Sequence, residues 1–390
     1  MSEGGTGPVS STTKRAPSRH APPRWRWRAL TAAYLAAVGI VIALPAGELV
    51  LRLERRAARR DSDRYKAQNV FANPWEMNVA HETLWKKPWT KYMPNARLDL
   101  TVGGERYDIR INSLGFRTEE FSPRKPAGTF RALCIGGSTT VAGRTNDETY
   151  PALLERALRE RHPGVALQIL NLGISGTTSE YWLERQQTLF GFEPDLVVEY
   201  RAVNDIFWRH LPRYAEQHPW RPVLHRSLLL ERLFPPPPAS FDPLFQQTDQ
   251  NFLQMDRLCR DHGARYLTAT FAAPDYAAAA PTFRRYLDLS LDFWNRELPL
   301  HGYPEYEALV ARHNEQLELL AHQHRMELVP VARELRDPAL FIDICHFTPE
   351  GIAKLALAFL PAVSRVIEFA PWRTTSPSTS PVRRAASKPS

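Results

Sequence analysis

The sequence predicts an α/β fold: a three-layer sandwich in which helices cover both faces of a central parallel sheet. Short apolar runs of strand length recur between residues 129 and 370, and segments with helical spacing of apolar residues separate them. Such alternation is typical of a parallel sheet with both faces buried. A chain of 390 residues, 43% of them apolar, is long enough to fill the large core that this fold needs.

The chain begins with a predicted tail and a predicted membrane anchor. Residues 1–28 are basic and rich in Gly, Ser, Thr and Pro, which indicates disorder. A transmembrane anchor is expected at residues 29–51, where 19 residues from Ala29 to Gly47 carry no charge. At about 1.5 Å per residue, this run just spans a bilayer core. We expect the anchor to stay uncleaved, because Leu44 stands where a signal-peptide cleavage site requires a small residue.

The charge of the chain is concentrated at its two ends. Residues 1–28 carry +5 and residues 371–390, a second predicted disordered tail, carry +4, so the formal charge of +8 leaves −1 for the remainder. A near-neutral body gives no indication of nucleic-acid binding. Basic residues flank both ends of the anchor, but the short tail before it favours a single-pass inner-membrane protein with its body outside the cytoplasm.

Residues 52–128 are predicted to form a charged stalk followed by a small β-rich module. The stretch RLDLTVGGERYDIRIN alternates apolar and polar residues on both sides of Gly103 and Gly104, which indicates a hairpin with a glycine turn. The sequence NSLGFR follows at residues 112–117. This module therefore precedes the sandwich as a separate structural element.

The predicted sandwich domain, residues 129–370, contains five expected strands and three long expected helices. The strands are expected at residues 130–135, 166–172, 194–200, 264–271 and 326–331, and the helices at residues 148–161, 306–325 and 349–369. Two segments, residues 207–250 and 273–305, interrupt the alternation and are expected to be lids or partner surfaces. In the first, Trp208 and Arg209 are candidate substrate-binding residues, because aromatic rings stack on sugars and arginine binds carboxylates and phosphates.

Ser138 directly follows the first expected strand and the pair Gly136 and Gly137. The glycines fit a tight turn in which Ser138 caps a helix, and they also fit a nucleophile held on a turn. A P-loop that binds phosphate is excluded, because no lysine follows the glycines. Since sites in open parallel sheets form beyond the carboxyl ends of the strands, Ser138 is a candidate nucleophile.

Asp343 and His346 stand three residues apart just before the last expected helix, which Thr348 can cap. A nucleophilic serine needs a base that takes its proton, and that base needs a partner that fixes its tautomer. One short loop with this spacing supplies both groups. Alone, the spacing also fits a helix-capping segment with a surface histidine, so it gains weight only together with other motifs.

The ends of the second and third expected strands carry candidate oxyanion donors. The segment NLGISGTTS places Gly176 after the second strand, where glycine lets a backbone N–H approach a ligand closely. Asn204 follows the third strand, and its side-chain amide is a further donor. Each segment alone also fits an ordinary turn, whereas Ser, Gly, Asn and Asp-x-x-His in this order form a specific set.

This set resembles the sequence blocks of the SGNH hydrolases, the GDSL-like esterase superfamily. GGSTT resembles the first block, NLGISGTTS the second, AVND the third, and DICH the block with the catalytic aspartate and histidine. The resemblance extends from Thr129 to Phe369, and NSLGFR resembles a feature of membrane-anchored bacterial members. Two positions depart from the pattern, because Gly137 replaces the usual aspartate and Ala202 the usual glycine.

The resemblance implies a flavodoxin-like fold and a serine esterase. Ser138 is implied as the nucleophile, His346 as the base and Asp343 as the group that orients His346. The backbone N–H groups of Ser138 and Gly176 and the side chain of Asn204 are implied as the oxyanion hole. No metal or organic cofactor is expected, since no third ligand cluster accompanies the aspartate and histidine and the three cysteines form no CxxC pair.

The expected substrate is an O-acyl group on a cell-envelope glycan or a related molecule, based on location and on the family alone. Two alternatives stay open. One is an O-acyltransferase that passes the acyl group to a sugar hydroxyl through the same acyl-serine. The other is a non-catalytic glycan-binding or assembly protein that keeps the fold. The complete set of Ser138, Asp343 and His346 argues against the second alternative.

Overall fold

The computed structural model describes residues 24–69, 92–102, 104–207, 226–234, 242–294 and 302–369. The chain divides into two compact units, residues 1–53 and residues 54–390. Most of the predicted N-terminal tail, the predicted C-terminal tail, and the candidate substrate-binding residues Trp208 and Arg209 lie outside the described residues. The two units are therefore described separately, beginning with the apolar segment near the N-terminus.

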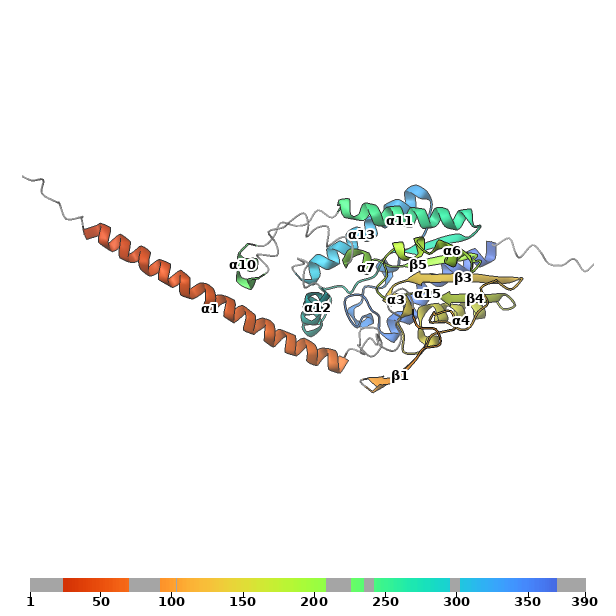
Figure 1. The fold of residues 1–390 in the computed structure, drawn as a ribbon, viewed down its shortest axis with the longest axis horizontal. Helices are drawn as coiled ribbons and strands as arrows, with labels where there is room; N and C mark the ends of the chain where they lie inside the picture. Colours follow the sequence, from red (N-terminus) through yellow and green to blue (C-terminus); the bar gives the residue numbers. More distant parts are fainter. Residues whose placement is uncertain are drawn as a thin grey trace, which may run out of the picture. The chain divides into compact units, whose positions relative to one another are not determined.

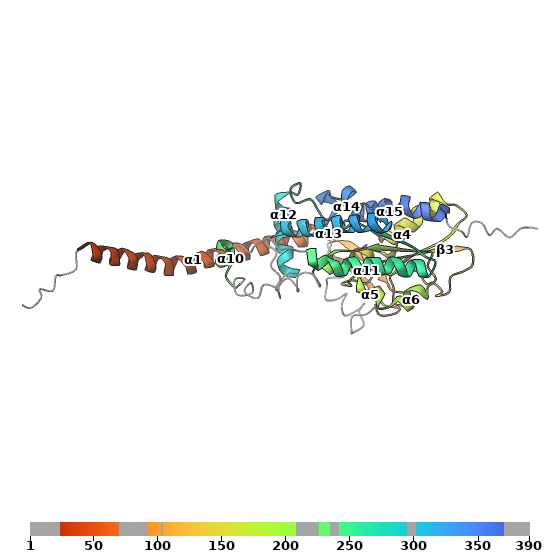
Figure 2. The same ribbon diagram turned by 90° about the horizontal axis from the view of Figure 1, so that it is seen from above.

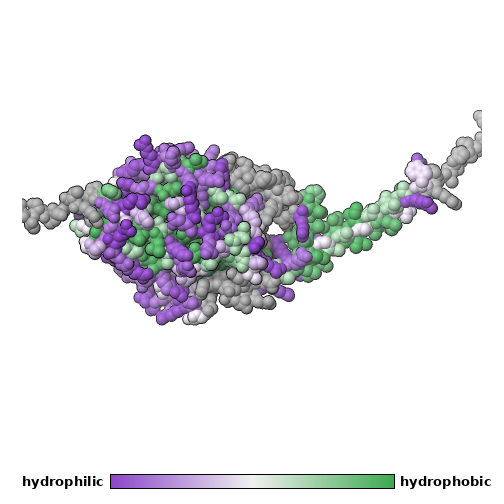
Figure 3. Space-filling model, turned by 180° about the vertical axis from the view of Figure 1, so that it is seen from behind, coloured by the Kyte–Doolittle hydropathy of each residue, from purple (hydrophilic) through white to green (hydrophobic). Residues whose placement is uncertain are grey.

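The N-terminal apolar segment forms one long helix, α1 (Arg24–Asn69). Its portion from Trp25 to Arg60 contains a stretch with a mean hydropathy of 2.1, of which 0% is buried. Large apolar side chains such as Leu35 and Val41 are 62% and 69% exposed, and Figure 3 shows hydrophobic side chains along this helix. By length and composition, α1 fits a signal anchor or a signal peptide. The helix starts inside the predicted disordered tail, whose helical end contains no Gly or Pro.

The β-rich module contains a two-stranded antiparallel sheet, β1 (Arg97–Val102) and β2 (Glu105–Arg110). The turn lies at the predicted glycine pair, and Gly104 has a φ of 85°, which glycine adopts without strain. One face of the hairpin buries Leu98 and Ile109. The other face carries exposed arginine–aspartate pairs. The hairpin therefore has one buried and one solvated face.

The central sheet confirms the predicted fold class. Its five strands lie in the order β4-β3-β5-β6-β7, and all neighbouring strands are parallel. The strands are β3 (Thr129–Gly136), β4 (Ala166–Asn171), β5 (Leu196–Tyr200), β6 (Arg265–Ala269) and β7 (Glu327–Val329). Because the strand order reverses between β3 and β5, a ligand site is expected beyond the carboxyl ends of these two strands.

Helices cover both faces of the sheet, as Figures 1 and 2 show. On one face lie α4 (Tyr150–Arg161) and α15 (Pro349–Phe369), and on the other α5 (Glu180–Leu183), α6 (Gln186–Phe190) and α11 (Asp242–Asp261). Consecutive residues of β3 serve both layers: Ala132 and Cys134 join one buried cluster, while Leu133 and Ile135 join the other. The apolar runs read from the sequence are therefore strands buried on both faces.

The other described helices complete the layers and the connections. They are α3 (Ser138–Val141), α7 (Val203–Asp205), α10 (Leu228–Leu233), α12 (Pro281–Trp294), α13 (Tyr303–His324) and α14 (Val331–Glu334), with short 3-10 turns at Asn146–Glu148 and Pro338–Leu340. The structure differs from the sequence analysis within the two expected insertions. Helix α11 begins inside residues 207–250, where Phe245 is 1% exposed, and α12 lies inside residues 273–305. These parts belong to the sandwich because their apolar faces are buried in its core.

Candidate active site

Ser138 is the first residue of α3, on a turn that follows directly from β3. A Cβ at Gly136 would lie 2.5 Å from the carbonyl oxygen of Tyr200, and a Cβ at Gly137 would lie 2.5 Å from Asn204 Nδ2. Gly136 has no room for a side chain, because the clashing atom belongs to the backbone, whereas a side chain at Gly137 would require Asn204 to move. The two glycines therefore bring the serine close to the end of β5 and to Asn204.

Three of the predicted residues form one hydrogen-bonded chain. His346 Nε2 lies 2.7 Å from Ser138 Oγ, and His346 Nδ1 lies 2.7 Å from Asp343 Oδ2. Ser138 is partly exposed, whereas His346 and Asp343 are 3% and 6% exposed. The other carboxylate oxygen, Asp343 Oδ1, accepts hydrogen bonds from the backbone N–H groups of Cys345 and His346 at 2.9 and 2.8 Å. These contacts hold the imidazole ring with its Nε2 atom toward the serine.

The same contacts determine the protonation of the pair. Burial disfavours the imidazolium, but the adjacent Asp343 carboxylate raises the pKa of His346 well above its ordinary value of 6.5. Burial alone would raise the pKa of Asp343, but the His346 ring and two backbone N–H groups hold that pKa below its ordinary value of 3.8. His346 can therefore act as a base only above its raised pKa.

The two further predicted oxyanion donors lie beside the turn that carries Ser138. Ile174 N donates a hydrogen bond of 3.0 Å to Gly136 O, and Thr177 Oγ1 lies 3.3 Å from the same oxygen, so the loop after β4 lies against the end of β3. In this loop Gly176 has a φ of 75°. Asn204 Nδ2 donates to Thr177 O at 2.9 Å. An amide nitrogen carries two protons, so this bond fixes the side chain and still allows a second donation.

Buried charged residues flank Asn204 in the chain and fix the end of β5. Arg201 Nε lies 2.6 Å from Glu199 Oε1, and both side chains are 2% exposed. Asp205 accepts hydrogen bonds from Ser179 N at 3.0 Å and from Ser179 Oγ at 2.7 Å. Burial raises the pKa of both acids, Glu199 and Asp205. Because the Asp205–Ser179 bonds connect the end of β5 with the loop after β4, they hold the two halves of the candidate oxyanion hole together.

Residues ahead of the sandwich also support the site, and the sequence analysis assigned them no role. Arg117, the last residue of NSLGFR, is 1% exposed and donates to Val141 O and, at 3.0 Å, to Gly143 O. These carbonyls belong to the end of α3 and the chain that leaves it. Tyr92 Oη accepts a hydrogen bond of 2.9 Å from Ser175 N, in the loop after β4. The NSLGFR motif was the one sequence signal for this support, and it did not reveal the partners.

Cys345 adds a third potential ligand to the aspartate and histidine that the sequence analysis considered for a metal site. Its Sγ lies 3.5 Å from His346 Nδ1, and the ligand atoms of Asp343, Cys345 and His346 lie within 4.8 Å of one another. Cys345 lies within the Asp343–His346 segment itself, so this third ligand does not require the separate cluster that a metal site was expected to need. A metal ion there would have to displace the hydrogen bond between His346 and Asp343, so the observed arrangement fits a base and its orienting carboxylate better.

A parallel sheet of this strand order, with hydrogen-bonded serine, histidine and aspartate beyond its carboxyl ends, defines the class of SGNH-type hydrolases of carboxylic esters. The chain belongs to the GDSL-like Lipase/Acylhydrolase family, whose sequence pattern matches residues 134–354, more than half of its length. The chain is therefore an acylhydrolase, and the matched segment contains Ser138, Gly176, Asn204, Asp343 and His346.

Solved structures similar to this chain have low sequence identity. An α/β hydrolase from the metagenome of Lake Arreo in Spain is 20% identical with a TM-score of 0.40, and the match covers 62% of this chain and 97% of that chain. An acetylxylan esterase from Geobacillus stearothermophilus is 18% identical with a TM-score of 0.41, over 63% of this chain and 97% of that chain. A GDSL-like lipase from Bacteroides thetaiotaomicron is 15% identical with a TM-score of 0.35, over 61% and 88%. The comparison with curated proteins found no match.

Proposed function

We propose that Ser138, His346 and Asp343 are the catalytic triad of this esterase. Ser138 Oγ attacks the carbonyl carbon of the ester while His346 Nε2 takes the hydroxyl proton. The tetrahedral intermediate collapses to an acyl-serine, and the same Nε2 gives its proton to the leaving alkoxide. Water then attacks the acyl-serine with His346 again as base, which releases the carboxylic acid and restores the serine. Asp343 orients the ring and stabilises the imidazolium in both steps.

The oxyanion of each tetrahedral intermediate is held by the backbone N–H groups of Ser138 and Gly176 and by the amide of Asn204. This assignment is supported by the contact between the loop after β4 and the end of β3, and by the hydrogen bond of 2.9 Å from Asn204 Nδ2 to Thr177 O. Donors that are already fixed in place stabilise a developing charge without a cost of reorganisation in the transition state.

The observation that carries the proposal is the unbroken chain of two hydrogen bonds of 2.7 Å from Ser138 through His346 to Asp343. Labelling of the purified full-length protein with a fluorophosphonate probe tests it, because such probes react with activated serines. We expect labelling of the wild type and none of Ser138→Ala. Ser113→Ala, which removes an exposed serine of the NSLGFR segment, should label like the wild type. A folded Ser138→Ala protein that still reacts would overturn the proposal.

We also propose that α1 tethers the enzyme to the inner membrane with its catalytic domain outside the cytoplasm. The exposed apolar stretch of α1, with a mean hydropathy of 2.1, supports a tether. Alkaline phosphatase is active only after export, so a fusion after Arg60 should be active. An inactive phosphatase, paired with a fluorescent cytoplasmic reporter fused at the same residue, would reverse the topology.

The proposed substrate is an O-acyl group on a cell-envelope glycan or a related envelope molecule. A tethered enzyme reaches only molecules near the membrane, and its family activity is the hydrolysis of acyl esters. Purified envelope material incubated with the wild type should release carboxylic acid, whereas Ser138→Ala should release none. An enzyme that hydrolyses small esters but releases no acid from any envelope fraction would reject this substrate and leave the esterase assignment intact.

A further inference from the structure

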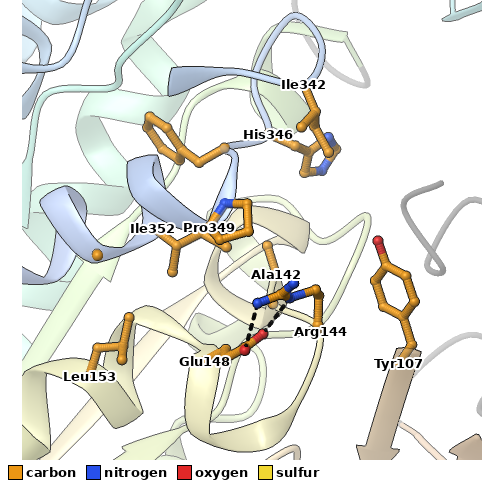
Figure 4. Close-up of a pocket in the computed structure, with 12 residues that line it drawn as sticks. Tyr107, Ala142, Arg144, Glu148, Leu153, Ile342, His346, Pro349 and Ile352 are labelled. Carbon is orange, nitrogen blue, oxygen red and sulfur yellow. Dashed lines mark hydrogen bonds and ion pairs between the residues drawn. The ribbon is translucent and has the colours of Figure 1, made fainter. Parts of the chain in front are cut away.

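A cavity of about 190 Å³ lies beside the ring of His346, as Figure 4 shows. Apart from that ring, most of its wall is hydrocarbon or aromatic and comes from separate parts of the chain. These apolar lining residues include Tyr107 of β2, Ala142 after α3, Leu153 of α4, and Ile342, Pro349 and Ile352 around the loop with His346 and the start of α15. Such a lining suits an apolar ligand.

The charged residues on the cavity wall are paired with each other. Arg144 donates two hydrogen bonds of 2.9 Å to Glu148, which Figure 4 shows, and one of 2.5 Å to Glu105 of β2. Tyr107 is 3% exposed, and burial raises its pKa to about 12, so its hydroxyl is neutral at physiological pH. The lining residues, all of which the structure describes, therefore favour an uncharged group over a carboxylate or phosphate.

The imidazole ring of His346 connects the cavity with the candidate nucleophile, Ser138. His346 lines it, and Nε2 of the same ring lies 2.7 Å from Ser138 Oγ. Ala142, also on the wall, directly follows the helix that Ser138 begins. The cavity is therefore adjacent to the proposed reaction centre, although Ser138 itself is not among the residues that line it.

The hairpin forms a fixed wall of this cavity. Glu105, two residues before Tyr107, accepts a hydrogen bond of 2.5 Å from Arg144 Nη1. Asp108, directly after Tyr107, donates from its backbone N–H to Arg144 O at 3.0 Å. Bonds on both sides of Tyr107 thus hold β2 against the segment that follows α3, so the position of the tyrosine ring is determined by the body of the enzyme.

We propose that this cavity binds an apolar chain of about six carbon atoms that is attached to the reacting ester, because a cavity of about 150 Å³ holds benzene. The inference rests on the proposed catalytic role of Ser138 and His346. It assigns the β-rich module a part in substrate selection, with Tyr107 as a specificity residue. The chain can belong to the acyl side or to the alcohol side of the ester, and the two sources can be separated by experiment.

Two series of esters test the proposal on the full-length enzyme in detergent. In one series, p-nitrophenyl esters carry acyl chains from acetyl to decanoyl, and in the other, acetate esters carry alcohols from methanol to decanol. We expect kcat/KM to increase about tenfold or more from two to six carbons in one series, because each buried methylene adds to transition-state binding. The series that shows the increase identifies the side of the ester that enters the cavity.

Leu153→Trp should fill the cavity from α4, where the leucine is partly buried. We expect this variant to lose the preference for six carbons, with about a tenfold lower kcat/KM for that ester and little change for the acetyl or methyl ester. Arg156→Trp is the matched control, because it adds the same ring to the exposed side of the same helix. It should keep the wild-type preference.

A binding measurement separates failure of this inference from failure of the proposed catalytic role. Hexyl acetate and ethyl hexanoate can be titrated calorimetrically into Ser138→Ala and into Ser138→Ala combined with Leu153→Trp. We expect at least tenfold weaker binding of one ester by the combined variant. The cavity assignment would be overturned if the two variants bound each ester equally well. It would also be overturned if Leu153→Trp left the chain-length profiles of hydrolysis unchanged. Hydrolysis that survives Ser138→Ala would overturn the catalytic proposal instead.

Discussion

The central sheet and the β1–β2 hairpin are both β-structure, but they are stabilised in opposite ways. In β3 every residue from Phe130 to Gly136 is buried, because helices cover both faces. The hairpin exposes one face, where Arg106 pairs with Asp99 at 2.8 Å. Apolar burial contributes much more to folding stability than exposed ion pairs do. The stability of the fold therefore depends mainly on the sheet. The presence of the hairpin requires an explanation other than stability.

The difference indicates that stability and substrate handling are divided between the two regions. The ends of β3 and β5 carry the proposed nucleophile, Ser138, and the proposed oxyanion donor, Asn204. The module ahead of the sandwich contributes Arg117, which contacts the chain after α3, and Tyr107, which lines the cavity. We expect substitutions of the reacting groups to have the largest effect on activity, those in the module a smaller one, and those on the exposed hairpin face almost none.

Asp343→Asn should show the largest effect among the variants that test this order. It keeps the shape of the loop but removes the carboxylate that orients His346 and raises its pKa. We expect kcat to fall by about 10³- to 10⁴-fold. In the wild type, kcat/KM should fall as the pH drops through the raised pKa of His346, above 6.5. In the variant, this acid limb should move to lower pH, because the carboxylate no longer stabilises the imidazolium.

A pH profile of ester hydrolysis for both proteins checks this prediction, with circular dichroism to establish that the variant is folded. An acid limb at the same pH in both proteins would mean that Asp343 does not determine the protonation of His346. A kcat within a few-fold of wild type would exclude the proposed triad even if the acid limb moved.

Asn204→Ala should rank second. The amide is proposed to hold the oxyanion, and loss of one such donor lowers kcat by about 10²-fold. The matched control is Asn314→Ala on α13, whose side chain is also bonded to backbone: it accepts from Phe271 N at 2.7 Å and donates to Phe271 O at 2.9 Å. The control should lower the melting temperature without a comparable loss of kcat. If Asn204→Ala changes KM alone, the amide contacts the substrate elsewhere.

The strands, and the meeting of Ser138 with His346 and Asp343, could be predicted because their signals are local. Residues such as Leu133 and Val197 stand in short continuous apolar runs, which is what a strand buried on both faces requires. Ser138 follows β3, where sites form in parallel sheets, and His346 stands three residues before the start of α15. The order of these signals along the chain, together with the resemblance to the SGNH hydrolases, predicted which side chains the fold brings together.

The support from the module could not be predicted, because burial of a charged side chain depends on partners that are remote in sequence. Arginine side chains usually lie on the surface, yet Arg117 is 1% exposed because the carbonyl oxygens of Val141 and Gly143 accept its hydrogen bonds.

Helix α11 was missed for a different reason. Its buried residues, such as Phe245 and Phe252, have helical spacing, but a proline-rich run just before them suggested an irregular insertion.

Arg117→Lys should have an intermediate effect on activity. It tests whether the module ahead of the sandwich supports the turn that carries Ser138. Lysine keeps the charge but cannot reproduce the fork that contacts both Val141 O and Gly143 O. We expect kcat to fall about tenfold, since the turn that positions Ser138 loses support, with little change in KM. Melting temperature and steady-state kinetics measure the two effects separately.

Arg131→Lys is the matched control for Arg117→Lys. Arg131 is 0% exposed and donates to Gln168 Oε1 at 2.9 Å and to Pro123 O at 2.8 Å, at the opposite end of β3 from Ser138. Both variants should lower the melting temperature, because each leaves buried acceptors unsatisfied. If Arg131→Lys lowers kcat as much as Arg117→Lys does, the effect comes from general loss of stability and Arg117 does not position the site.

Arg106→Gln should show the smallest effect, because it removes only an exposed partner from the hairpin. Arg106 is 65% exposed at its side chain, and its bond to Asp99 lies on the face away from Leu98 and Ile109. We expect the melting temperature to change by less than about 2 °C, and even less at high salt, because solvent already screens such pairs. Hydrolysis of both ester series should stay within about twofold of wild type. A clear loss of activity on six-carbon esters would mean that the ion pairs determine the shape of the hairpin and therefore the position of Tyr107. The exposed face would then contribute to substrate selection.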